Sequence, residues 1–164
     1  MRPPPSASSA GVTALVADIL EGGATVRLKV TGRSMWPLVP SGARVVVRPV
    51  DPMALRIGDM LLFRNTLGAS VLHRIVRIDR DPDYGRVLRT KGDALGAFDE
   101  PVTSDQVLGR AVRIERPLWR GRCWITDLDT PRWRWAGAVA ARVQLVGAKL
   151  LLKLRPSRGS RKQR

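Results

Sequence analysis

The segment SVLHRIVRID, residues 70–79, decides the fold, because its side chains alternate between two faces. In an extended strand, successive side chains point to opposite sides of the sheet. Val71, His73 and Ile75 therefore share one face, and Arg74 lies on the other. The segment predicts a β-strand that carries a histidine on one face and, at the next position, an arginine on the opposite face.

Short apolar runs of the same kind occur on both sides of this strand, and Gly, Pro and Asp separate them. The predicted strands are residues 24–32, 43–50, 59–65, 85–93 and 106–116. Ahead of them, residues 11–23 place Val12, Leu15, Val16, Ile19 and Leu20 at helical spacing, and a Gly-Gly pair ends the pattern. The pattern predicts a mainly β domain over residues 10–116 with a short N-terminal helix, after a disordered lead at residues 1–9.

The C-terminal part differs in composition from the β-rich part. Residues 117–155 are interpreted as a Trp-rich connection followed by a basic amphipathic helix, and residues 156–164 as a basic tail. Apolar side chains share one face of this helix, with Arg142, Lys149 and Lys153 off it. These apolar residues are Val139, Val143, Val146, Leu150 and Leu154.

Net charge concentrates in the same region. The chain carries 29 basic and 14 acidic residues, and residues 132–164 contain ten Lys or Arg and no acidic residue. With Trp133 and Trp135 at its start, the helix is typical of one that lies in an anionic membrane surface. The alternatives are a helix packed on the β domain or on a protein partner, and nucleic acid, which ranks last. The expected location is peripheral to a membrane, or else cytoplasmic.

The composition also bears on disulfides, metal sites, cofactors and membrane-spanning segments. Cys123 is the one cysteine and His73 the one histidine, so we expect no internal disulfide, no metal site and no cofactor. The longest uncharged run, residues 3–17, is 15 residues long and begins PPPSASS. A membrane-spanning helix needs about 20 apolar residues. We therefore expect no spanning segment.

One serine stands out in TGRSMWPLVPSG, residues 31–42, where Gly and Pro crowd the chain just before a predicted strand. Ser34 is either a turn residue or a nucleophile that the turn exposes to a substrate. A hydroxyl needs a base that removes its proton and a third group that orients the base. The base is either His73 or a lysine, and Asp93 and Asp99 follow in a Gly-interrupted loop that offers an orienting carboxylate.

In this order, the segments resemble the boxed pattern of type I signal peptidases. The segments are TGRSMWPLV, IGDMLLF, VLHRIVRI, TKGDALGAFD and VLGRAV, over about residues 28–115. The pattern is more similar to the branch in which histidine replaces the general-base lysine, found in endoplasmic-reticulum complexes, archaea and some spore-forming bacteria. Ser34 falls on the family's serine before methionine, and His73 falls on its base.

The resemblance implies a coiled, mainly antiparallel β fold and a serine endopeptidase that cleaves a peptide or preprotein leader after small residues. It implies that Ser34 attacks, that His73 transfers the proton and that Asp99, rather than Asp93, orients the ring. Asp93 would instead hold the turn, paired with Lys91 or Arg74. The substrate would bind as an added strand next to the serine.

Residues directly after the serine are expected to contact that substrate; they are Met35, Trp36 and Pro37. Two other functions remain open. A self-cleaving relative of the same fold would cut its own N-terminal arm, where an Ala10-Gly11 bond is present. A catalytically idle β module would bind peptides or anchor a partner at the membrane.

Overall fold

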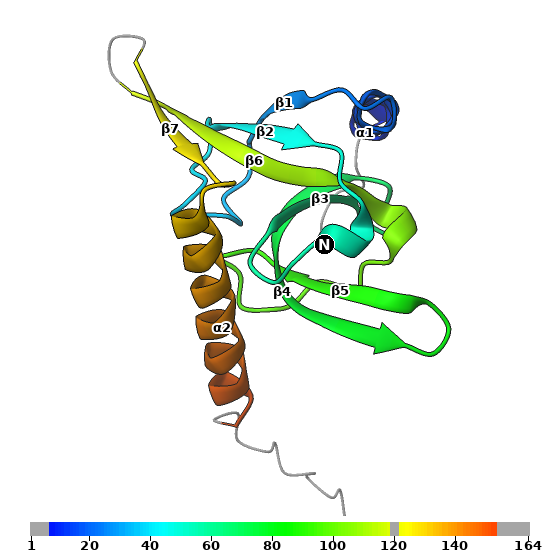
Figure 1. The fold of residues 1–164 in the computed structure, drawn as a ribbon, viewed down its shortest axis with the longest axis vertical. Coiled ribbons are helices and arrows are strands. Elements are labelled where there is room, and N and C mark those ends of the chain that lie inside the picture. The colour runs from blue at the N-terminus through cyan, green and yellow to red at the C-terminus, as the bar shows by residue number, and fades with distance from the viewer. Residues whose placement is uncertain (1–6, 119–121, 154–164) are drawn as a thin grey trace, which may run out of the picture.

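The computed structural model describes residues 7–118 and 122–153. Within these ranges, seven strands form one antiparallel sheet that curls round on itself, and a helix lies near each end (Figure 1). The helices are α1 (Ala7–Glu21) and α2 (Pro131–Lys153), with short 3-10 turns η1 (Pro52–Ala54) and η2 (Ser104–Gln106). The strands are β1 (Val26–Lys29), β2 (Arg44–Arg48), β3 (Met60–Arg64), β4 (Ser70–Asp81), β5 (Gly85–Lys91), β6 (Val107–Pro117) and β7 (Cys123–Asp127).

Strand order in the sheet is β1-β2-β6-β3-β4-β5, and β7 pairs with β6. The predicted mainly β fold with a helix on either side is therefore present. In the pairing of β4 with β5, Arg74 lies opposite Lys91 and Ile75 lies opposite Thr90. Directly paired residues project to the same face, so this register puts Thr90 on the His73 face and Lys91 on the Arg74 face.

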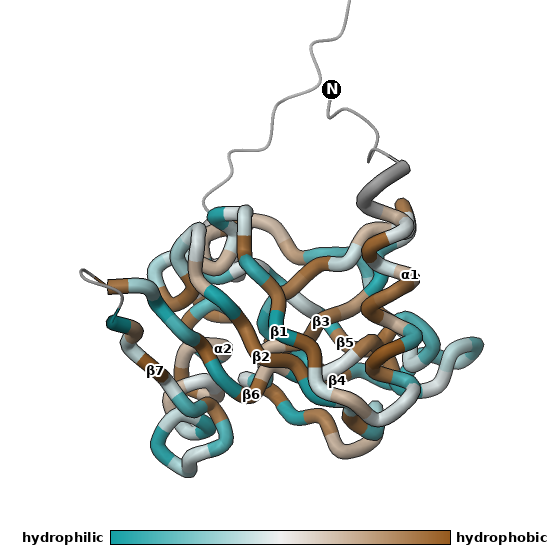
Figure 2. The backbone as a smooth tube through the Cα atoms, turned by 90° about the horizontal axis from the view of Figure 1, so that it is seen from above, coloured by the Kyte–Doolittle hydropathy of each residue, from teal (hydrophilic) through white to brown (hydrophobic). Residues whose placement is uncertain are grey.

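The alternation of β3 and β4 divides the core into two clusters, one on each face of the sheet. The larger cluster includes Leu20, Val45 and Leu62, and α1 covers part of it. The smaller one is built around Leu61 and Ile75. Figure 2 shows the hydrophobic positions of α1 and the strands interleaved with hydrophilic ones along each element. The alternation of side chains between the two faces fixes which strand residues meet on either side.

The N-terminal helix is longer than predicted. It begins at Ala7, inside the predicted disordered lead, and residues 1–6 lie outside the described part of the chain. Val16 and Leu20 are buried against the sheet, whereas Val12 and Leu15 are exposed. Only part of its apolar face therefore packs on the domain.

The sheet extends beyond the predicted boundary at residue 116. Strand β7 follows in the segment interpreted as a Trp-rich connection, and it pairs along the end of β6, with Ile125 opposite Glu115. Trp124 and Ile125 are both exposed. The segment had no alternation of buried and exposed apolar residues to mark it as a strand, because most of its side chains remain in solvent.

Helix α2 packs on the domain through small residues. A Cβ atom placed on Gly137 would lie 2.7 Å from the carbonyl oxygen of Gly58, so helix and loop backbones touch. Ala141 is fully buried on the same side, while Val143 and Val146 on the apolar face are exposed. Much of the predicted apolar face is thus exposed rather than packed on the sheet. In the part of the chain with a described structure, neither helix has the length and apolar character needed to cross a bilayer.

Candidate active site

His73 and Asp99 form a close pair on one face of β4. The Nδ1 atom of His73 lies 2.6 Å from Oδ2 of Asp99, and the histidine side chain is buried. The Thr90 hydroxyl donates to the same carboxylate oxygen at 2.8 Å, and the Asp99 amide donates to the Thr90 carbonyl at 3.0 Å. Thr90 therefore fixes both the backbone and the side chain of Asp99.

This pair determines which ring nitrogen can act as a base. An ionised carboxylate only accepts hydrogen bonds, so Nδ1 of His73 carries the proton shared with Asp99. In the neutral ring, the other nitrogen, Nε2, is then an acceptor. The arrangement gives a buried imidazole whose tautomer is set by an acid, as general-base catalysis requires.

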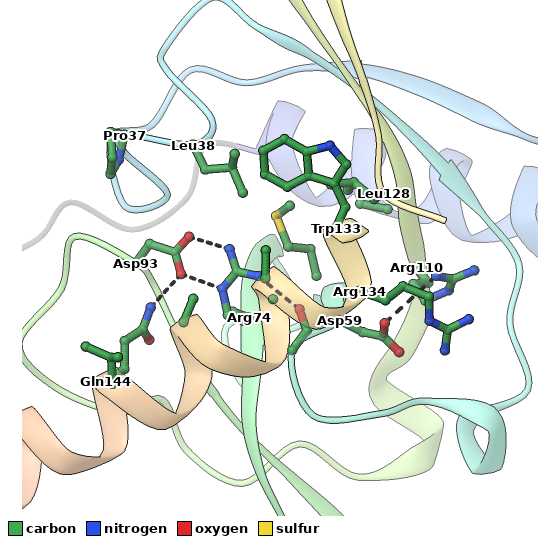
Figure 3. A pocket seen from close by; sticks show the side chains of 17 residues that line it. Pro37, Leu38, Asp59, Arg74, Asp93, Arg110, Leu128, Trp133, Arg134 and Gln144 are labelled. Carbon is green, nitrogen blue, oxygen red and sulfur yellow. Dashed lines mark hydrogen bonds and ion pairs between the residues drawn. The ribbon is translucent and has the colours of Figure 1, made fainter. Parts of the chain in front are cut away.

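Asp93 is bound on the opposite face of β4. Its carboxylate accepts a bidentate pair from Arg74, at 2.8 Å from Nε and 2.6 Å from Nη2, and Gln144 of α2 donates to it at 2.7 Å (Figure 3). Arg74 also donates to the Gly58 carbonyl at 2.9 Å. Arg74 is buried, and the Asp93 side chain is 9% exposed. Because His73 and Arg74 are consecutive, their strand directs one acid to each face.

Lys91, the lysine nearest to these acids in sequence, is buried on the Arg74 face. His73 faces the other side of the sheet, where Asp99 and Thr90 lie. Of the two candidates for the base, Lys91 and His73, only the histidine has the orienting acid, Asp99, beside it.

Ser34 lies in a turn between β1 and β2, and its backbone is tied to the loop that contains Asp93. The Ser34 carbonyl accepts a hydrogen bond from the Ala94 amide at 2.8 Å. A Cβ atom on Gly92 would lie 2.8 Å from that same oxygen, so only glycine permits this approach. Within residues 7–118 and 122–153, no hydrogen bond joins the Ser34 hydroxyl to His73.

A groove of about 390 Å³ opens beside the serine. One wall is the segment from Lys29 to Gly32 that continues β1, and the other is the start of β4, from Ser70 to Leu72. Its floor is apolar and includes Val45, Val47 and Leu62. Strand β1 is at the end of the sheet order, so the groove runs along a sheet edge.

The three residues after Ser34 lie in different surroundings. Met35 is buried and lines this groove, Trp36 is exposed, and Pro37 lines a separate cavity between the sheet and α2. The structure therefore brings Met35 to the groove and places Pro37 elsewhere. Thr90 and Gln144 were not among the predicted site residues. The alternation of residues 85–93 is a signal for Thr90, whereas the sequence pattern contains none for Gln144.

No family model matches the chain. A curated protein, signal peptidase I W of Bacillus subtilis (strain 168), is 33% identical over 85 residues, which are 51% of this chain and 44% of that protein. The chain thus spans less than half the length of this relative. A partial similarity of this kind supports a relationship to type I signal peptidases and a serine peptidase function at the level of the family.

Proposed function

We propose that this protein is a serine endopeptidase of the signal peptidase type, with Ser34 as nucleophile, His73 as general base and Asp99 as the acid that orients the base. The observation that carries the proposal is the buried hydrogen bond between His73 Nδ1 and Asp99 Oδ2, 2.6 Å long. It prepares an imidazole acceptor on the strand that also forms one wall of the groove beside Ser34.

In the proposed reaction, the Ser34 hydroxyl attacks the scissile carbonyl while His73 accepts the hydroxyl proton. The histidine then returns that proton to the leaving amine as the peptide bond breaks, and Ser34 remains acylated. Water, deprotonated by His73, releases the acyl group and restores the serine. The Ser34 amide is a candidate donor to the oxyanion, since backbone amides commonly serve in this role.

The peptide would lie in the groove as an extended strand. Backbone hydrogen bonds to a sheet edge supply affinity in this mode, and shallow pockets select alternate side chains. The apolar floor formed by Val45, Val47 and Leu62 suits small apolar residues before the cleaved bond. We therefore propose a peptide or preprotein leader as substrate, with small residues at the first and third positions before the cleavage site.

A self-cleaving function is less compatible with the structure. Ala10 and Gly11 lie within α1 (Ala7–Glu21), and a peptidase groove of this type takes extended chain. Cleavage at this bond would require unwinding the helix, and mass spectrometry of the purified protein would then find a product that begins at Gly11. The idle-module alternative differs in having no serine that reacts with an active-site probe.

The decisive experiment compares Ser34→Ala and His73→Ala with Ser41→Ala on a peptide that carries small residues before the bond. Ser41 lies in the same turn region, and its hydroxyl donates to the Thr31 carbonyl at 3.2 Å, so it is a matched serine control. We expect the first two variants to lose cleavage and serine-probe labelling, and Ser41→Ala to keep both. Full activity in both Ser34→Ala and His73→Ala would refute the proposal.

We further propose that α2 contacts an anionic lipid surface from the outside of the domain. Trp135 and Val146 are 71% and 67% exposed, and helical spacing puts both opposite Gly137, which packs on the domain. Val143 is 66% exposed and lies at the border of this face, where it also lines the cavity between helix and sheet. Strand β7 adds Trp124 and Ile125, which line a shallow hollow together with the tryptophans at the start of α2. Interfacial helices combine such an apolar face with basic side chains, as the charge of residues 132–164 provides.

A further inference from the structure

Helix α2 is anchored to the domain at two points that are two turns apart. At the first, Gly137 meets Gly58 backbone to backbone, and a Cβ atom on Gly58 would lie 2.5 Å from the Ala138 amide nitrogen. At the second, seven residues later, Gln144 donates from Nε2 to Asp93 Oδ1 at 2.7 Å. A cavity of about 390 Å³ lies between the helix and the sheet around these contacts (Figure 3).

The second anchor is a buried polar contact with an unsatisfied atom. Gln144 Oε1 is buried and has no hydrogen-bond partner among the described residues. A buried acceptor without a partner destabilises the fold. The one hydrogen bond found for this amide among the described residues is the one that its nitrogen donates to Asp93.

Asp93 connects this anchor to both halves of the candidate site. On one side, its carboxylate holds Arg74, the residue that follows His73 on β4. On the other side, its backbone continues to Ala94, whose amide donates to the Ser34 carbonyl at 2.8 Å. Asp93 therefore links the turn that contains Ser34 to the strand that contains His73.

We propose that Gln144 is a positioning residue: through Asp93, α2 holds the turn that carries Ser34 in place relative to the strand that carries His73. The inference rests on the proposed peptidase function for its catalytic consequence. A displacement of about 1 Å in a reacting group can cost about a hundredfold in rate. Loosening Asp93 should therefore slow turnover while the groove still binds peptide.

Three substitutions at one position test the role of the donor. Gln144→Met keeps the length of the side chain and removes both the donor and the unpaired acceptor. Gln144→Glu places a second carboxylate against Asp93, and Gln144→Lys restores a donor. We expect kcat to fall about tenfold or more in Gln144→Met and further in Gln144→Glu, with KM nearly unchanged, and Gln144→Lys to recover most of the loss.

Gln106→Met is the matched control, because Gln106 accepts a hydrogen bond from the Thr103 amide at 2.9 Å and has no link to Asp93. Both glutamine-to-methionine variants lose a hydrogen bond, but only Gln144→Met should change kcat. Thermal unfolding of the variants separates a loss of folded protein from a loss of rate. Equal kcat in Gln144→Met and wild type would overturn the inference.

Hydrogen exchange gives a second measurement that needs no activity. In Gln144→Glu, we expect the Ala94 amide to exchange faster than in wild type, since its bond to Ser34 depends on the position of Asp93. Unchanged exchange at Ala94 would overturn the inference. A third outcome is also informative: exchange at Ala94 is faster in Gln144→Glu, but the wild-type protein neither cleaves peptide nor reacts with a serine probe. That outcome would support the coupling through Asp93 and reject the proposed peptidase function.

Discussion

At the scale of single residues, the site depends on two consecutive positions of β4. His73 and Arg74 project to opposite faces, and each face holds one of the two acids of the loop after β5. Asp99 therefore pairs with the imidazole, and Asp93 with the guanidinium. The two carboxylates are six residues apart in sequence, yet they have different partners, and substitutions should affect them differently.

We predict different effects for the two matched substitutions Asp99→Asn and Asp93→Asn. Asp99→Asn should lower kcat by about 10³- to 10⁴-fold, because an amide can hold His73 in the wrong tautomer. Asp93→Asn should lower the free energy of unfolding by about 3 kcal/mol, because buried Arg74 loses its charged partner. Peptide cleavage and urea unfolding measure the two effects. A larger loss of stability in Asp99→Asn than in Asp93→Asn would contradict these assignments.

The residues of the candidate site were predictable to different degrees. Alternation in residues 70–79 placed His73 and Arg74 on opposite faces, and the family resemblance selected Ser34 and favoured Asp99. Gln144 was not predictable, because it is more than 40 residues from Asp93 in sequence and meets it only through the packing of α2. A contact of this kind depends on how two elements dock, which periodicity does not encode.

At the scale of elements, the predictable strands were those whose apolar side chains are buried or partly buried on one face or on both, from β1 to the fully enclosed β3. The five stretches between residues 24 and 116 with this pattern, together with residues 70–79, correspond to β1 through β6. Strand β7 has one buried residue, Thr126, so its sequence lacks the pattern. For α2 the sequence predicted a helix with an apolar face, but small residues on another face allow the closer approach to the sheet.

The docking of α2 through Gly137 gives a prediction at this scale. Gly137→Ala should lower the free energy of unfolding by about 1–3 kcal/mol, because the added methyl group overlaps the Gly58 carbonyl and one backbone must move. Gly11→Ala in α1 is the control, since a Cβ atom there has nothing within 4 Å. Alanine should stabilise α1 by about 0.5–1 kcal/mol. Thermal unfolding measures both, and an unchanged midpoint for Gly137→Ala would contradict the packing of α2.

At the scale of the whole molecule, the two faces of α2 have separate proposed roles. The inner face holds Asp93 through Gln144, and the outer face presents Trp135 and Val146 to solvent. Exposed apolar side chains also occur on α1, at Val12 and Leu15. The molecule therefore has two candidate surfaces for lipid, and charge distinguishes them. Residues 7–21 contain two acidic and no basic side chains, whereas the segment around α2 is strongly basic.

Binding to vesicles tests which surface makes the contact. We expect the full chain to sediment with vesicles that contain phosphatidylglycerol and much less with pure phosphatidylcholine, because basic side chains are attracted to anionic lipid. Trp135→Ser and Val146→Ser should each weaken sedimentation several-fold, since each removes apolar area from the outer face of α2.

Leu67→Ser is the matched control for these variants, because Leu67 is as exposed as Val146 but lies in the turn between β3 and β4. Raising the salt concentration should release the protein, since screening weakens the attraction between basic side chains and anionic lipid. If Leu15→Ser abolished sedimentation and the α2 variants did not, the contact would belong to α1. Because the α2 variants leave Gln144 in place, cleavage of a soluble peptide should remain near wild type even where vesicle binding is lost.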